Sequence, residues 1–246
     1  MEILISEEKG VRQLHFGSQW VQGAMRLSRP DALELEYTRE MMLPLLLNPQ
    51  PWWPRSALFI GLGVGAMPRF LHKHRPQCRI QVVEIEPSVV SVARMHFKLP
   101  ADGPQFQVSL GCGAAHVAET TEKYDLIFID GFDENARVGP LNTKDFYSNA
   151  LARLQPGGWV VANLLSNQKD STQAIDRFKD AFDGNAVVLP PCSSGNVIAL
   201  GSQEVIDLDV NELTVKSDKL LEETGLNLSK STHKLIQAIQ GSLKKE

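Results

Sequence analysis

Three glycines at alternate positions, Gly61, Gly63 and Gly65, directly follow a short apolar run, Ala57–Ile60. Such a run predicts a buried strand, and the glycines predict a tight turn into a helix. Glycine adopts backbone conformations that a β-carbon disfavours, and it lets a ligand approach main-chain N–H groups closely. This pattern suits the binding of a nucleotide or nucleoside. The alternative is that the glycines only tighten the turn between strand and helix.

A carboxylate ends the next apolar run, Arg79–Glu84, about 20 residues after the glycines. In a nucleotide-binding α/β unit, a carboxylate at this place accepts hydrogen bonds from the two ribose hydroxyls. Glu84 is therefore the candidate ribose ligand, with a solvated charge at the strand end as the alternative. Glu86 is followed by Pro87, and this pair is typical of a helix start.

Two further acids, Asp130 and Asp133, follow an apolar run at 124–129. In open α/β sheets, ligands bind at the carboxyl ends of the strands, so both acids are expected to lie over the candidate nucleoside site. Acids suit a cationic substrate, because a sulfonium electrophile and an amine both gain from nearby negative charge. One carboxylate can also take up the amine proton. For Asp133 the alternative is the cap of a turn.

The elements that position these residues alternate between strands and helices. Apolar strands are expected near 56–60, 79–84, 106–110, 124–130 and 159–164, with helices between the first four and a helix over 143–154 before the fifth. This alternation predicts an α/β fold with a mainly parallel sheet covered on both faces. The last two predicted strands, 186–189 and 196–200, are too close together for a parallel crossover, so they must form an antiparallel hairpin. A parallel sheet with such an ending resembles the class I S-adenosylmethionine-dependent methyltransferase fold, which has seven strands.

The chain divides into three predicted segments. Residues 1–50 form a small N-terminal β element of three short strands and a linking helix over 31–47, which Pro44 must bend or interrupt. Residues 51–204 form the Rossmann-like domain. Residues 205–246 form a helical tail whose charged faces are expected to be solvated.

The composition excludes several classes of protein. With 246 residues and 43% hydrophobic residues, the chain is long enough for one large core, and its net charge of −4 gives no basic field for a nucleic acid. Three cysteines far apart predict neither a disulfide framework nor a zinc site. No signal sequence or run of 18 apolar residues is present, so no membrane partner and a cytoplasmic location are expected.

Together these motifs resemble the spermidine synthase group of aminopropyltransferases. The resemblance extends from about residue 14 to residue 200, and it rests on the segments Trp20–Gly23, Gly61–Gly65, Val83–Pro87 and Tyr124–Asp130, together with Tyr37 and Asp133. It implies that certain residues face the active site, namely Gln22, Tyr37, Glu84, Asp130 and Asp133. Of these, Asp130, Asp133 and Tyr37 are the predicted catalytic residues.

The sequence departs from the family at three places. Val64 stands where the family has an aspartate that holds the amino group of the donor, and Thr38-Arg39 stands where the family has His-Glu or Gln-Glu. Cys112-Gly113 stands where the family has an Asp-Gly or Asp-Ala pair that contacts adenine. The predicted donor-binding residues are therefore the following: Gln22, Gly61, Gly63, Gly65, Glu84, Cys112 and Gly113.

The resemblance implies transfer of an aminopropyl group from decarboxylated S-adenosylmethionine to an amine such as putrescine, without a metal. S-adenosylmethionine is the alternative co-substrate. Val64 keeps open a methyltransferase on the same scaffold, and the lost aspartate keeps open a nucleoside-binding homologue without activity. A small-molecule amine is the expected partner. Exposed edges of the N-terminal strands predict a homodimer.

Overall fold

The computed structural model describes residues 2–17, 20–131, 139–166, 171–204 and 209–243. Its centre is a seven-stranded sheet in the order β6-β5-β4-β7-β8-β10-β9. The strands, in that order, are β6 (Phe106–Leu110), β5 (Arg79–Glu84), β4 (Ser56–Ile60), β7 (Tyr124–Ile129), β8 (Leu154–Leu165), β10 (Asn196–Ser202) and β9 (Ala186–Val188). The pairs from β6 to β8 are parallel, and β10 is antiparallel to both β8 and β9. The predicted hairpin and fold class are thus confirmed.

Side chains of β4 explain why this strand is apolar along its whole length. Ala57 and Phe59 enter one core cluster, whereas Leu58 and Ile60 enter the other. Because successive side chains point to opposite faces, a strand buried on both faces carries no polar position. Phe59 stacks on Phe128 of β7 with ring centroids 4.5 Å apart.

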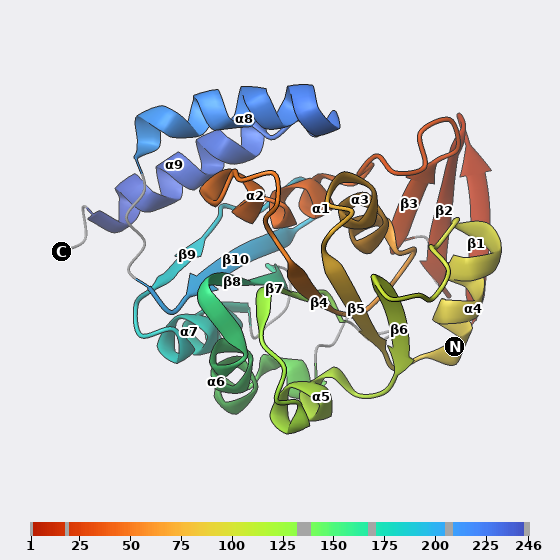
Figure 1. Cartoon of the computed structure of the whole chain (residues 1–246), viewed down its shortest axis with the longest axis horizontal. Coiled ribbons are helices and arrows are strands. Elements are labelled where there is room, and N and C mark those ends of the chain that lie inside the picture. Colours follow the sequence, from red (N-terminus) through yellow and green to blue (C-terminus); the bar gives the residue numbers. More distant parts are fainter. Residues whose placement is uncertain (1, 18–19, 132–138, 167–170, 205–208, 244–246) are drawn as a thin grey trace.

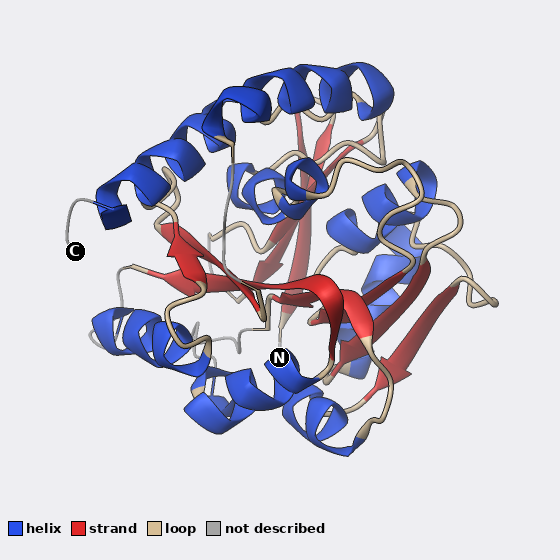
Figure 2. Ribbon diagram, turned by 60° about the vertical axis from the view of Figure 1, so that its left-hand side comes forward, coloured by secondary structure: helices blue, strands red, loops and turns tan. Residues whose placement is uncertain are grey.

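Helices cover both faces of the sheet (Figures 1 and 2). One face is covered by α5 (Gly113–Glu119), α6 (Lys144–Ala152) and α7 (Ser171–Ala181). The other is covered by α1 (Glu36–Met41), α2 (Pro44–Leu47), α3 (Ala66–His74), α4 (Pro87–His96), α8 (Val210–Thr224) and α9 (Ser229–Leu243). A 3₁₀ turn, Gly139–Asn142, precedes α6.

A separate antiparallel sheet, β1 (Ile3–Glu8), β2 (Val11–Phe16) and β3 (Gly23–Arg26), forms the N-terminal element. The helix expected over 31–47 is shorter and divided. It starts at Glu36 and breaks at Met42 and Leu43, and α2 begins at Pro44, which has no N–H to continue the helical ladder of α1. Helix α7 was not predicted from the sequence.

The C-terminal helices are more than a solvated tail. Leu213, Leu220 and Leu235 are buried in the cluster that also holds residues of α1 and α3. Lys234 of α9 is turned inward, where its Nζ lies 2.6 Å from Oε1 of Glu40 and 3.2 Å from Oε1 of Glu36. One core cluster therefore joins residues from all three predicted segments.

Glu40 is 1% exposed, and its Oε2 has no hydrogen-bond partner among the described residues. Burial raises the pKa of Glu40, and the hydrogen bond from Lys234 acts in the opposite direction. Removing the lysine would leave a buried carboxylate without its counter-ion.

We therefore expect Lys234→Met to lower the free energy of unfolding by roughly 2–3 kcal/mol at neutral pH, less than for a fully buried pair because Lys234 is partly exposed. Since the folded state favours protonated Glu40, the deficit should shrink as the pH falls from neutral towards the ordinary glutamate pKa of 4.5, where the relief is complete. Urea denaturation of the variant and the parent at several pH values measures this difference in the free energy of unfolding. The control is Lys216→Met, which removes a surface ion pair with Glu212 on α8 and should cost at most about 0.5 kcal/mol. Equal losses in both variants would contradict the argument.

Candidate active site

A cavity of about 920 Å³ opens beyond the carboxyl ends of β4, β5, β7 and β8. This edge is where the strand order reverses, since β5 and β7 lie on opposite sides of β4. The cavity is lined by the glycine loop, by the turns that follow β5 and β6, and by residues 20–24 and 34–38 of the N-terminal segment. The N-terminal segment therefore closes the side of the site that the central sheet leaves open.

The glycine loop has the predicted backbone conformation. Gly61, Gly63 and Gly65 have φ values of +93°, +52° and +65°. A β-carbon on Gly61 would lie 2.2 Å from the carbonyl oxygen of Asp130, so no other residue fits there. Gly61 and Gly63 line the cavity. Gly65 is not among the lining residues, and a β-carbon there would meet the side chain of Leu99, so its role is packing.

Glu84 lies at the cavity wall and holds the glycine loop. Its Oε2 accepts a hydrogen bond from the N–H of Leu62 (2.8 Å), and its Oε1 accepts one from the N–H of Glu86 (2.9 Å). Burial raises the pKa of Glu84, and these backbone donors oppose the rise. Each carboxylate oxygen has two lone pairs, so Glu84 retains acceptor capacity for a ligand.

Asp130 stands at the end of β7 within a chain of amides. Asn163 of β8 donates to Oδ1 of Asp130 (2.7 Å), and Asn196 of β10 donates to Oδ1 of Asn163 (2.9 Å). Ser194 in turn donates to Oδ1 of Asn196 (2.6 Å). The chain fixes the orientation of the Asp130 carboxylate from two neighbouring strands.

Tyr37 completes the surroundings of Asp130. The Tyr37 hydroxyl hydrogen-bonds to Asp130, and burial together with this carboxylate raises the pKa of Tyr37 well above its usual value. Burial raises the pKa of Asp130, while the donors Asn163 and Tyr37 oppose the rise. The arrangement is a protonated tyrosine beside a carboxylate that is a stronger base than an exposed one.

The structure brings most of the other predicted residues to the same cavity. Gln22, Cys112 and Gly113 line it, and a β-carbon on Gly113 would lie 2.2 Å from Cγ2 of Ile60. Asp133 lies outside the described residues. Val64 also lines the cavity, but its side chain is 3% exposed and packs where a β-carbon on Gly23 would be.

All ionisable Asp, Glu, Lys, Arg and His side chains in the described wall of the cavity are acidic. Five carboxylates line it among the described residues, whereas no lysine, arginine or histidine does. These acids are Glu34, Glu36, Glu84, Glu86 and Asp130. Such a lining favours cationic ligands.

Three lining residues were not predicted from the sequence: Asn163, Asn196 and Glu36. Asn163 carried a usable signal, because it interrupts an otherwise apolar strand, Trp159–Leu164, near its carboxyl end. Glu36 carried none. Its Oε2 accepts from Ser193 Oγ (2.7 Å) and its Oε1 from Lys234, and both partners are distant in sequence.

Comparison with known proteins agrees with this geometry. The sequence model described as the spermine/spermidine synthase domain matches residues 34–200. A polyamine aminopropyltransferase of Chromobacterium violaceum is 35% identical over 240 residues, which are 97% of this chain and 91% of the relative. The chain belongs to the spermine/spermidine synthase family. It is accordingly an enzyme of the transferase class, as the sequence predicted.

Solved structures show the family's fold in two kinds of protein. A probable spermidine synthase from Corynebacterium glutamicum is similar with a TM-score of 0.74 and 22% identity, covering 89% of this chain and 83% of that one. Human methyltransferase-like protein 13, in complex with SAH, is similar with a TM-score of 0.70 and 24% identity, covering 78% and 93%. The fold therefore does not by itself distinguish aminopropyl from methyl transfer in this synthase family member.

The described part of the chain contains neither a candidate membrane-spanning helix nor a candidate metal site. None of its helices has the length and apolar character needed to cross a bilayer. Within the same residues, no three His, Cys, Asp or Glu side chains are grouped as a metal ion would require.

The hydrogen bond from Asn163 to Asp130 predicts how the pKa of Asp130 depends on Asn163. Asn163→Leu should raise the pKa of Asp130 further, because it removes a donor that stabilises the carboxylate. Carbon NMR of the labelled aspartate carboxyl groups measures this pKa. Asn211→Leu, the same change at an exposed position on α8, is the control and should leave the pKa of Asp130 unchanged. An unchanged value in Asn163→Leu would show that Asn163 does not stabilise the charge.

Proposed function

We propose that this enzyme transfers an aminopropyl group from decarboxylated S-adenosylmethionine to a primary amine. The observation that carries the proposal is the acidic lining of the cavity, in which Glu84, Glu86 and Asp130 have no ion-pair partner among the described residues and no described lining residue is basic. Glu34 and Glu36 also line it, but they are paired with Arg26 and Lys234. The decarboxylated donor bears a sulfonium and an ammonium group, and the acceptor amine is a cation in water. S-adenosylmethionine would add a carboxylate, for which the described lining offers no counter-ion.

The donor roles follow the positions of the lining residues. Glu84 accepts hydrogen bonds from the ribose hydroxyls with the lone pairs that the loop amides leave free. Gly61 and Gly63 leave space for the nucleoside beside the main chain, and Cys112 and Gly113 contact the adenine. Gln22 contributes an amide from the N-terminal segment.

In the reaction, the acceptor amine must be neutral when it attacks. Asp130 takes up the ammonium proton, and the nitrogen lone pair then forms a bond to the donor methylene carbon as the carbon–sulfur bond breaks. The bonding electrons remain on sulfur, and 5′-methylthioadenosine leaves. Tyr37 and Asn163 hold the carboxylate of Asp130 in place. Holding nitrogen, carbon and sulfur in line supplies much of the rate.

A methyltransferase is the second candidate, and Val64 is the observation that favours it. The aspartate of the family would pair the donor ammonium, and without it the affinity for the decarboxylated donor falls roughly ten- to a hundredfold. The remaining acids keep the electrostatic preference for that donor. Putrescine as acceptor, a homodimer formed through the N-terminal strands and a cytoplasmic location stay predictions.

Titration calorimetry of the same sample with the two donors tests this choice. We expect the decarboxylated donor to bind at least about tenfold more tightly, since the carboxylate of S-adenosylmethionine would be buried unpaired among acids. The reverse preference would favour the methyltransferase.

The role of Asp130 has its own test. Asp130→Asn should lower turnover by about 10²–10⁴, because the amide cannot take up a proton, while donor affinity stays within a few-fold. Steady-state kinetics at saturating amine and calorimetry with the donor give the two quantities. A variant that retains more than about a tenth of parental turnover would exclude Asp130 as the base.

Glu84→Gln should weaken the binding of 5′-methylthioadenosine more than about tenfold, since the amide offers one acceptor oxygen instead of two and perturbs the glycine loop. Glu119→Gln, at an exposed position on α5, is the matched control and should bind as the parent does. If Glu84→Gln folds and binds equally well, the ribose assignment fails.

A further inference from the structure

A second cavity, of about 960 Å³, lies between the turn that follows β3 and the connection from α8 to α9. Its wall also includes Phe70, Lys73 and His74 from the end of α3. Figure 1 shows α3 and the segment after β3 lying near these two C-terminal helices. The second cavity adjoins the catalytic one, because Glu34 and Glu36 line both.

The charge of the second cavity is opposite to that of the first. Five lysine and arginine residues line it against three acids among the described residues. The cations are Arg26, Arg29, Arg39, Lys73 and Lys230, and the acids are Asp31, Glu34 and Glu36. The excess is thus two positive charges.

The acids are already paired, so the excess falls on particular residues. Arg26 pairs with Glu34, and Lys73 pairs with Asp31. Glu36 pairs with Lys234, which is not part of this wall. Within the described chain, no carboxylate forms an ion pair with the three remaining cations: Arg29, Arg39 and Lys230.

Arg39 is the cation whose position is fixed. Its Nη1 donates to the carbonyl oxygens of Leu33 (2.9 Å) and Glu34 (2.8 Å), and its side chain is half-buried. The other guanidinium N–H groups form no further hydrogen bond among the described residues. They are arranged as a planar fork of the kind that binds phosphate or carboxylate oxygens in pairs.

The wall also offers apolar surface. Leu33, Phe70 and Leu226 are buried residues that line the cavity, and the ring of Phe70 lies against that of His74 with centroids 4.6 Å apart. The volume exceeds what a bare anion fills. The ligand that fits therefore combines an anionic group with an organic part.

We propose that this cavity is a second binding site, separate from the catalytic one, for an organic phosphate. The phosphate is held by the three cations without an ion-pair partner, Arg29, Arg39 and Lys230, while the organic part lies against Phe70 and Leu33. The start of α9 adds little, because Oδ1 of Asn227 already accepts from the N–H of Ser229. The three cations and the cavity carry the proposal.

Calorimetry with phenyl phosphate at low ionic strength is the test, with inorganic phosphate and benzoate as separate probes. We expect one saturable site per chain for phenyl phosphate and weaker binding of the other two. The double variant Arg29→Gln/Lys230→Gln, which changes exposed residues only, should bind at least about tenfold more weakly. The single variant Arg39→Gln should also bind phenyl phosphate at least about tenfold more weakly than the parent. Glu84→Gln should bind as the parent does, which places the ligand outside the catalytic cavity.

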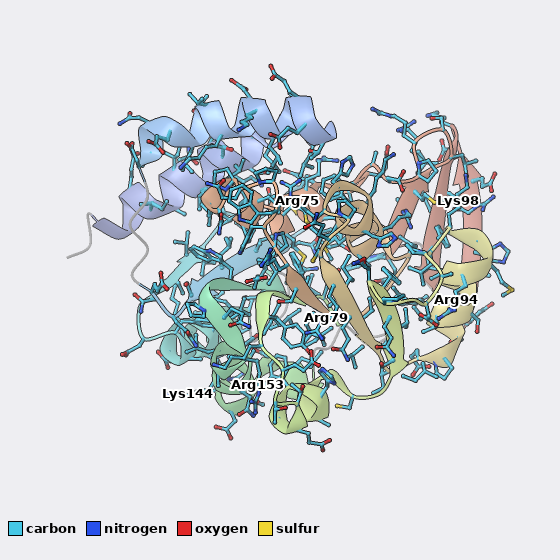
Figure 3. The ribbon with its side chains drawn as sticks, in the orientation of Figure 1. Arg75, Arg79, Arg94, Lys98, Lys144 and Arg153 are labelled. Atoms are coloured by element: carbon cyan, nitrogen blue, oxygen red, sulfur yellow. The ribbon has the colours of Figure 1, made fainter. Side chains whose placement is uncertain are left out.

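Lys98→Gln/Lys144→Gln is the control for loss of two positive charges. Both residues are exposed, and Figure 3 shows them away from α8 and α9, with Lys144 on α6 across the sheet. The control should bind as the parent does. Absence of saturable binding to the parent, parental affinity in both cavity variants, or an equal loss in the control would each overturn the proposal. Tighter binding of benzoate than of phenyl phosphate would overturn its phosphate class.

Discussion

The close approach of two strand ends is the constraint on which the site depends. The carbonyl oxygen of Asp130 occupies the space where any residue larger than glycine at position 61 would place its β-carbon. The loop that is to hold the donor and the carboxylate that is to act on the acceptor are therefore fixed against each other by main-chain packing. Glu84 continues this arrangement, because it accepts hydrogen bonds from both Leu62 and Glu86. A ligand at Glu84 thus meets a loop whose shape is already set.

Two neighbouring cavities of opposite charge share the segment around α1. The short segment around α1 separates a cavity lined by acids from one with an excess of cations. A carboxylate on this segment affects both sides, and Lys234 limits the effect by pairing with Glu36 and Glu40. The segment from Glu34 to Arg39 is therefore the part of the chain where substitutions act on two binding surfaces at once.

Local patterns were sufficient for most of the fold. Apolar runs, glycines with positive φ, and the short connection before Asn196 predicted the sheet and its antiparallel hairpin. The start of α1 was placed five residues too early, because Asp31 and Glu34 form ion pairs with Lys73 and Arg26 that only the structure shows. α7 was missed although its Ala174 and Phe178 are buried, since only a few of its positions are apolar. Asn163 stands out locally as a polar residue in an apolar strand, but its partner Asp130, like the partner Ser193 of Glu36, lies on another element and is not specified by any local pattern.

The contact between Lys234 and Glu40 has a consequence for biosynthesis. The two residues are 194 positions apart, so this contact is among the most non-local in the protein. Loop closure over such a distance comes late in folding. While the ribosome still holds α9, Glu40 on α1 lacks its counter-ion, and the second cavity lacks the part of its wall that Ser229, Lys230 and Ser231 form. The central sheet can form during translation, but the second cavity takes its final shape only after α9 has emerged.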